Sequence, residues 1–286
     1  MNVSKRLLWR AVLPGQICLV MLLGSALAAD VPASHPSLDQ GFRLLYNLDF
    51  DPAHQVFLAW EHEHPQDPVG PTAEAAGLLF SEFHRLGVLE AQFYESDKKF
   101  LDRDKKDPDT GVRDRFNAAL ARAQSAASTR LAANAKDRDA LFAMTLSSGL
   151  RADYAALIEK KNMSSLHYTR EANDWADQLL AVDPNCYDAR VATGFSKYII
   201  GSMAAPVRWF LRMGGVSGDK KQGIVELQMT ADHGQYLGPF ARILLAIAYV
   251  RENDDAHARQ LLASLRDEFP KNTLFTHEIA RLDAGH

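Results

Sequence analysis

One spacing constrains the fold of this chain more than any other feature, and it occurs near both ends. In "DPAHQVFLAWEHEHP" the small residue Ala53 precedes Pro65 by twelve positions, and in "DDAHARQLLASLRDEFP" Ala258 precedes Pro270 by the same number. Apolar residues around both segments recur every three or four positions, as they do on one face of an α-helix. A small residue lets two helices pack closely, and a proline ends the second helix. The pattern therefore predicts pairs of packed helices.

The first helix of each pair carries its own small residue, twelve positions before that of the second helix. These residues are Gly41 near the start of the chain and Ala246 near its end. Because the two sets of offsets agree, regular repeats are predicted at about residues 34–67 and 239–272. Alternating β-branched runs are scarce between them, so the whole chain is predicted to be all-α.

Degenerate repeats are predicted over about residues 69–238, where small residues lie further apart. Gly194 precedes the next candidate, Gly223, by 29 residues, and Thr145 precedes Ala172 by 27. The extra length predicts insertions between the first and second helices of the internal repeats. Insertions at equivalent places in a stacked array emerge on one side, which is often the side that binds.

These motifs resemble those of the tetratricopeptide-repeat (TPR) proteins, over most of residues 34 to 283. Leu245, Ala246 and Tyr249 occupy the L-G/A-x-x-Y positions of the first TPR helix. The segments "YDARVATGFSKYIIGS" and "RWFLRMGGVSGDKKQGIVEL" are also similar to uncharacterised exported bacterial TPR proteins and, more distantly, to the inclusion-body-clearance and TPR-39 proteins. The resemblance implies a TPR-like right-handed helical solenoid of about five helix pairs that binds proteins or peptides, without chemistry of its own.

The first 28 residues have the features of a signal peptide. Lys5, Arg6 and Arg10 precede an apolar run, and "ALA" at 26–28 has the small-x-small form of a cleavage site. Cleavage after Ala28 is predicted, which leaves one domain over 29–286 that is exported, or periplasmic in a Gram-negative source. An uncleaved anchor helix is the alternative.

Charge and cysteine content restrict the possible partners of the mature chain. The leader holds three of the 32 basic residues and none of the 36 acidic ones, so the formal charge after cleavage is −7 (29 − 36). That balance argues against nucleic acid and anionic lipid as main partners. Cys186 is the one cysteine left, so no disulfide forms within the mature chain, and it is expected to be a small apolar residue at a helix start.

The repeat register also predicts which side chains face the inner groove of the solenoid. Groove and partner-binding positions are expected at Phe42, Tyr46, Phe195, Tyr198 and Arg251. An aromatic and apolar groove of this kind fits a peptide or helix of a partner, or one of the chain's own insertions packed into it. The second option is favoured, because the insertions are long and apolar.

The longest apolar insertion contains "PVRWFLRMGGVSGDKKQG", residues 206–223. Arg208 and Arg212 share one face of a short helix, while Trp209 and Phe210 lie on an apolar side. Either aromatic residue is predicted to be buried against the scaffold; contact with a membrane is possible but not favoured, because about two turns with two cations bind weakly.

No motif for catalysis, a cofactor or a metal site is recognised. His54, His62 and His64 do not share one helix face, and Asp102 to Gly111 fails the spacing of a calcium loop. The sequence therefore predicts a non-enzymatic scaffold or adaptor without cofactor that binds a protein or peptide. A small-molecule or lipid carrier, with an apolar pocket closed by the insertions, is the alternative.

Overall fold

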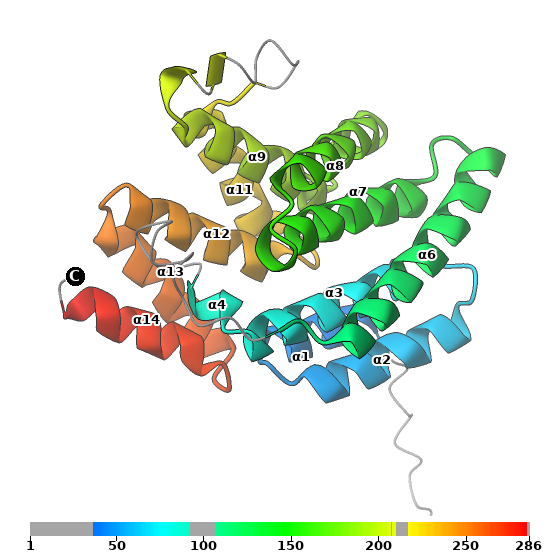
Figure 1. Cartoon of the computed structure of the whole chain (residues 1–286), viewed down its shortest axis with the longest axis horizontal. Helices are drawn as coiled ribbons and strands as arrows, with labels where there is room; N and C mark the ends of the chain where they lie inside the picture. Colours follow the sequence, from blue (N-terminus) through cyan, green and yellow to red (C-terminus); the bar gives the residue numbers. More distant parts are fainter. Residues whose placement is uncertain (1–36, 92–106, 207, 210–216, 285–286) are drawn as a thin grey trace, which may run out of the picture. The chain divides into compact units, whose positions relative to one another are not determined.

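All regular secondary structure is helical in the residues that this computed structural model describes, which are 37–91, 107–206, 208–209 and 217–284 (Figure 1). The helices in chain order are α1 (Leu38–Tyr46), α2 (Phe50–Glu63), α3 (Val69–Arg85), α4 (Val88–Ala91), α6 (Thr110–Ala133), α7 (Arg138–Asp153), the π-helix η1 (Tyr154–Ile158), α8 (Asn162–Val182), the 3₁₀-helix η2 (Tyr187–Ala189), α9 (Arg190–Ser202), α11 (Lys220–His233), α12 (Gly238–Arg251), α13 (Asp255–Glu268) and α14 (Thr273–Asp283). The predicted all-α fold class is confirmed.

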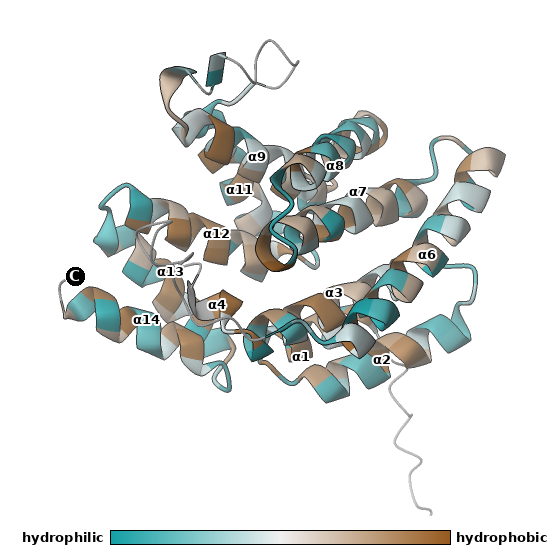
Figure 2. Cartoon of the chain, viewed as in Figure 1, coloured by the Kyte–Doolittle hydropathy of each residue, from teal (hydrophilic) through white to brown (hydrophobic). Residues whose placement is uncertain are grey.

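These helices pack as five successive pairs, followed by α14. The pairs are α1 with α2, α3 with α6, α7 with α8, α9 with α11, and α12 with α13. Each pair also contacts the next one, and its apolar faces join one hydrophobic core. In Figure 2, α2, α13 and α14 carry hydrophobic and hydrophilic residues side by side, as expected of helices that bury a single face. The chain is therefore a TPR-like array of about five helix pairs, as predicted.

One spacing is common to the second helix of all five pairs. Each contains a buried small residue, and each ends at a C-cap residue eleven positions later. These small residue and C-cap pairs are Ala53 and His64, Ala123 and Asn134, Ala172 and Asp183, Gly223 and Gly234, and Ala258 and Phe269. The degenerate repeats thus have the same number of residues as the regular ones between the small residue of the second helix and the end of that helix.

The two regular repeats also share an unusual turn between their helices. Leu48 and Asn253 both have positive φ, at 62° and 59°, and each lies five residues before the small residue of the second helix. The next residue in each turn, Asp49 or Asp254, donates its N–H to a carbonyl five positions back at 2.9 Å. Few non-glycine residues adopt this conformation, so the equivalence supports the assignment of both segments as one kind of unit.

Small residues bring the paired helices into direct backbone contact. A Cβ atom added to Gly223 would lie 2.6 Å from the carbonyl oxygen of Gly194, so α9 and α11 touch at these two residues. The pairing of Gly194 with Gly223 is confirmed. In the first pair, a Cβ atom on Gly41 would lie 2.2 Å from the ring of Phe57, which is fully buried.

The extra residues of the three internal pairs take two forms. In the pairs α3–α6 and α9–α11 they connect the two helices, and residues 92–106 and 210–216 of these connections lie outside the described part. Helices are also lengthened: α6 has 24 residues and α8 has 21, and α7 continues into η1. All three elaborations lie between the first and second helix of a pair, which is the predicted place.

The predicted leader and its cleavage site lie within residues 1–36, outside the described part, so the division at Ala28 stays a prediction. None of the described helices is both long enough and apolar enough to cross a membrane. In residues 36–286 the helices form one compact unit.

Candidate partner-binding site

The inner face of the helix array is filled by its own aromatic side chains. Phe42 of α1 stacks on Tyr236 with ring centroids 5.1 Å apart, and Phe142 of α7 stacks on the same tyrosine at 5.9 Å. Phe80 of α3 meets Phe240 of α12 edge-to-face at 5.5 Å. First helices of four different pairs, together with the α11–α12 connection, therefore pack on one another where an open solenoid has a groove.

This packing corrects the prediction of a partner groove. Phe42, Tyr46 and Tyr198 expose 3%, 8% and 1% of their surface, so they form part of the core and present no open surface. Phe195 is half-buried against the same core, and Arg251 at the end of α12 is exposed. The favoured option placed one of the chain's insertions in the groove, whereas the residues described there belong to the helices and to the α11–α12 connection.

Contacts between the first pair and the end of the last one hold the array in this form. Asn272 donates from Nδ2 to the backbone oxygen of Tyr46 at 2.9 Å, in a buried position. Lys271 forms an ion pair with Asp49 at 2.8 Å, and the ring of Phe269 packs on Tyr46. Each of these contacts joins residues more than 200 positions apart in the sequence. We call this set of five residues the clasp: Tyr46, Asp49, Phe269, Lys271 and Asn272.

A cavity of about 300 Å³ lies beside the clasp. Phe42 and Tyr46 line it, so the structure brings these two predicted groove residues to one cavity. Glu268 accepts bonds from both Arg242 and Arg43, the latter at 2.9 Å. Although burial acts to raise the pKa of Glu268, the two guanidinium groups lower it below its ordinary value. Three charged groups of the cavity, those of Arg43, Arg242 and Glu268, are thus already engaged with one another.

Asp188 fixes the connection that closes the inner face. Its carboxyl group is buried and accepts from the backbone N–H groups of Gln235 and Tyr236 at 3.1 Å and of Leu237 at 3.0 Å. Burial raises its pKa, although the three N–H groups act in the opposite direction. Because Tyr236 carries the inner aromatic contacts, Asp188 positions the residue on which α1 and α7 meet. The sequence gave no indication of this role.

The connection after α9 differs from its predicted packing. Arg208 donates from Nη1 to the backbone oxygen of Gly201 at 3.0 Å, which ties the segment to the end of α9. Trp209 is 66% exposed, so the prediction that Trp209 or Phe210 is buried is wrong for Trp209. Phe210 and Arg212 lie outside the described residues. The indole of Trp209 is therefore presented to solvent.

A cluster of charged side chains around the buried Glu74 joins the first two helix pairs. Arg122 of α6 bonds Glu74 at 2.6 Å and Glu61 at 3.2 Å, and His54 lies 3.7 Å from Glu74. Burial, followed by the neighbouring carboxylate of Glu61, raises the pKa of Glu74 to about 7, against the effect of Arg122. Burial and then Arg115 lower the pKa of His54. In this contact between the first two helix pairs, the charged form of Glu74 is therefore unfavourable near neutral pH.

Glu74→Gln is expected to raise stability at pH 8 by about 1–2 kcal/mol, relative to the native chain. The folded state binds the Glu74 proton more tightly than the unfolded state does, because the pKa rises from 4.5 to about 7. This contribution is most favourable below pH 4.5 and is lost as the pH increases to about 7. Urea unfolding at pH 5 and pH 8 measures it. An equal effect of the substitution at both pH values would contradict the assignment.

Three further features of the sequence can be placed in the structure: the histidines of α2 and its C-cap, the aspartate-rich segment before α6, and Cys186. His64 stacks on Trp60 with ring centroids 4.0 Å apart, and among the described residues no group of three or more His, Cys, Asp or Glu side chains is placed to hold a metal. In the segment from Asp102 to Gly111, which fails the spacing of a calcium loop, residues 102–106 lie outside the described part. Cys186 is 4% exposed, directly before η2, and burial raises the pKa of its thiol.

Comparisons with known proteins add little to this description. No family model matches the chain, and no curated protein matches it. Among solved structures, TTC0263, a thermophilic TPR protein of Thermus thermophilus, is similar to it with 15% sequence identity and a TM-score of 0.42, covering 87% of this chain and 100% of that one. The description as a TPR-like array rests on the helix pairs and their register.

Proposed function

We propose that this chain is an exported, non-enzymatic scaffold that binds a protein partner through the edge where its first and second helices are connected. The observation that carries the proposal is the exposed Trp209 on the α9–α11 connection. Exposure of an indole to water is unfavourable, and tryptophan is enriched among the residues that dominate the binding energy of protein interfaces. The filled inner face also favours binding at this edge, because a partner could enter the inner face only by separating Phe42 from Tyr236.

The position of Trp209 suits a docking role. Arg208 binds the end of α9 through Gly201, so the neighbouring indole is held close to the scaffold and its ordering on binding costs less. Met203, 37% exposed, adds apolar surface on the same connection. A partner with an apolar pocket that accepts an aromatic side chain fits this surface.

Export is supported by the sequence of the leader and by the composition of the mature chain. The cations, apolar run and cleavage motif before Ala29 are those of a signal peptide. A single cysteine after cleavage leaves folding independent of disulfide formation in an oxidising compartment. In a Gram-negative source the scaffold would be periplasmic. The charge of −7 (29 − 36) favours a protein partner over nucleic acid or anionic lipid.

One observation supports the alternative of a small-molecule carrier: the cavity of about 300 Å³ beside the clasp. Its volume is at the lower end of the range for ligand sites. Arg43, Arg242 and Glu268 also line it and bind one another, so an apolar lipid chain would lie against charged groups. The cavity therefore supports the carrier less well than Trp209 supports the scaffold.

Trp209→Ala is expected to weaken binding of the partner by about 30-fold or more, as the loss of an interface anchor does. A photo-crosslinking amino acid at position 209 first identifies the partner in cells, and the affinity of that partner for the variant is then measured. The melting temperature should stay within about 2 °C of the native value, since an exposed side chain contributes little to stability.

Met163→Ala is the matched control, because Met163 is 79% exposed at the start of α8, on a different helix pair. It should leave partner affinity unchanged, and a photo-crosslinker there should capture no partner. Unchanged affinity of Trp209→Ala would contradict the proposal. So would crosslinking from position 209 to lipid alone, which would assign the segment to a membrane.

A further inference from the structure

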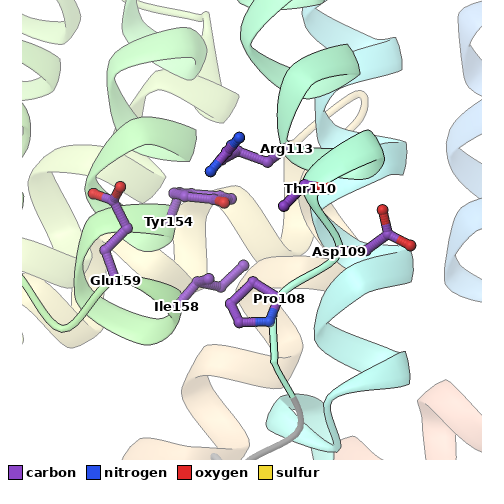
Figure 3. A pocket seen from close by; sticks show the side chains of 7 residues that line it. All are labelled: Pro108, Asp109, Thr110, Arg113, Tyr154, Ile158 and Glu159. Atoms are coloured by element: carbon purple, nitrogen blue, oxygen red, sulfur yellow. The ribbon is translucent and has the colours of Figure 1, made fainter.

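A separate cavity of about 240 Å³ lies where the second and third helix pairs meet. It is formed by the start of α6 and by η1, the π-helix that ends α7 (Figure 3). Its lining consists of Pro108, Asp109, Thr110, Arg113, Tyr154, Ile158 and Glu159. The α3–α6 connection ends at the start of α6, and η1 leads from α7 into the turn before α8, so the cavity lies on the elaborated edge and away from the filled inner face.

Tyr154 is the most informative residue of this cavity. It is 8% exposed, and its ring stacks on Phe116 with centroids 5.0 Å apart and an interplanar angle of 15°. In Figure 3 its hydroxyl oxygen points towards Thr110 across the cavity. No described residue forms a hydrogen bond with that hydroxyl. The ring is thus held in place by Phe116, while its hydroxyl is free to bond a ligand that enters the cavity.

The π-helix explains how the tyrosine reaches this position. Glu159 donates its N–H to the carbonyl of Tyr154 and Lys161 to that of Ala155, which widens the last turn of the helix. Lys160 then takes a positive φ of 58° and the chain turns into α8. Single π-turns of this kind are rare and frequently occur at functional sites. The widened turn presents Tyr154 and Glu159 to the same cavity.

The other polar groups of the cavity offer both hydrogen-bond donors and acceptors. Thr110 contributes a hydroxyl group at the first turn of α6, and Arg113 contributes a guanidinium group whose Nε and Nη2 are bound to Asp114. Asp109 caps α6 by accepting from Val112 N–H, and that bond holds its pKa below the ordinary value. Glu159 forms an ion pair with Lys161 at 3.2 Å. The two ion pairs are each neutral, and the Asp109 carboxylate adds a negative charge, so the cavity does not favour an anionic ligand.

We propose that this cavity binds a neutral, polyhydroxylated ligand the size of a single sugar ring. Hydroxyl groups can both donate to Glu159 and accept from Arg113, and they pair with the Tyr154 hydroxyl in either sense. Ile158 and Pro108 supply apolar surface for the C–H groups of a ring. The volume equals about eight water molecules at their liquid volume, which leaves no room for a long chain.

Tyr154→Phe separates binding from folding. Because the hydroxyl has no protein partner among the described residues, its removal should leave the melting temperature unchanged or slightly higher. Saturation-transfer NMR on the full chain, with glucose, galactose, mannose and inorganic phosphate as probes, should show saturable millimolar binding of at least one sugar. The affinity for that sugar should fall at least about tenfold in Tyr154→Phe, the effect of losing one hydrogen bond that binds the ligand.

Tyr168→Phe is the control, since this half-buried tyrosine lies on α8 and does not line the cavity. It should bind the sugar as the native chain does. Three results would overturn the proposal: no saturable binding of any of the three sugars, saturation by phosphate alone, or equal sugar affinity of Tyr154→Phe and the native chain. The outcome is independent of the partner proposed for Trp209, which lies on another helix pair.

Discussion

Asp188→Ala should destabilise the folded chain by about 3–5 kcal/mol, the largest effect expected from a single substitution of a polar residue. The substitution removes the acceptor for three backbone N–H groups, those of Gln235, Tyr236 and Leu237; the bond from Leu237 is buried and the other two are partly buried. For a chain of this size the loss corresponds to a decrease of roughly 6–15 °C in melting temperature. Urea unfolding followed by circular dichroism measures the free energy.

Asp188→Asn and Asp174→Ala provide the comparison for this result. The amide oxygen of asparagine replaces one of the two acceptor oxygens, so an intermediate loss is expected. Asp174 is an exposed aspartate of α8, and its substitution should change stability by less than about 0.5 kcal/mol. Native-like stability of Asp188→Ala would show that Asp188 does not hold the α11–α12 connection.

Gly223→Ala is expected to cost about 2–3 kcal/mol, although alanine favours helix formation. The added methyl group would lie 2.6 Å from the backbone of Gly194 and of Tyr198, and backbone atoms cannot move aside as a flexible side chain can. The α9 and α11 helices must then separate, which also loosens the packing of Tyr198, a fully buried side chain. Thermal and urea unfolding both report the change.

Gly149→Ala is the matched control, because it makes the same substitution inside α7. No atom lies within 4 Å of the position of the added methyl group. Removal of a helix-interior glycine should therefore increase stability by about 0.5–1 kcal/mol. Opposite signs for the two substitutions would support close pairing at Gly223, whereas a stabilising Gly223→Ala would contradict it.

The helix pairs could be predicted from the sequence because their determinants are local. A small residue sets the closest approach of two helices and proline ends the second one, so Ala53, Ala172 and Ala258 each precede a proline by twelve positions. The second pair cannot be placed by this pattern, because Ala123 has an alanine, Ala135, at the position of that proline. Its spacing of eleven residues to the C-cap is recognisable only when the helix ends are known.

The candidate surfaces could be predicted only in part, because they depend on contacts between distant residues. The register placed Phe42 and Tyr46 on the inner face, but burial there results from Tyr236 and Asn272, about 190 and 226 positions further along. An apolar run around Trp209 indicated burial by composition, whereas its exposure depends on where the connection leaves α9. For Tyr154, a hydroxyl among apolar residues gave no signal in the sequence.

The central claim is that the array is held closed by the clasp, so that partners meet its edge. Zero-length carbodiimide crosslinking of the monomer tests it directly, because this reagent joins only groups in contact. The account predicts a crosslink between Lys271 and Asp49, separated by 222 positions, alongside the control crosslink of the adjacent pairs, Lys220 to Glu252. Recovery of the control without the Lys271–Asp49 crosslink would show an open array and would contradict the account.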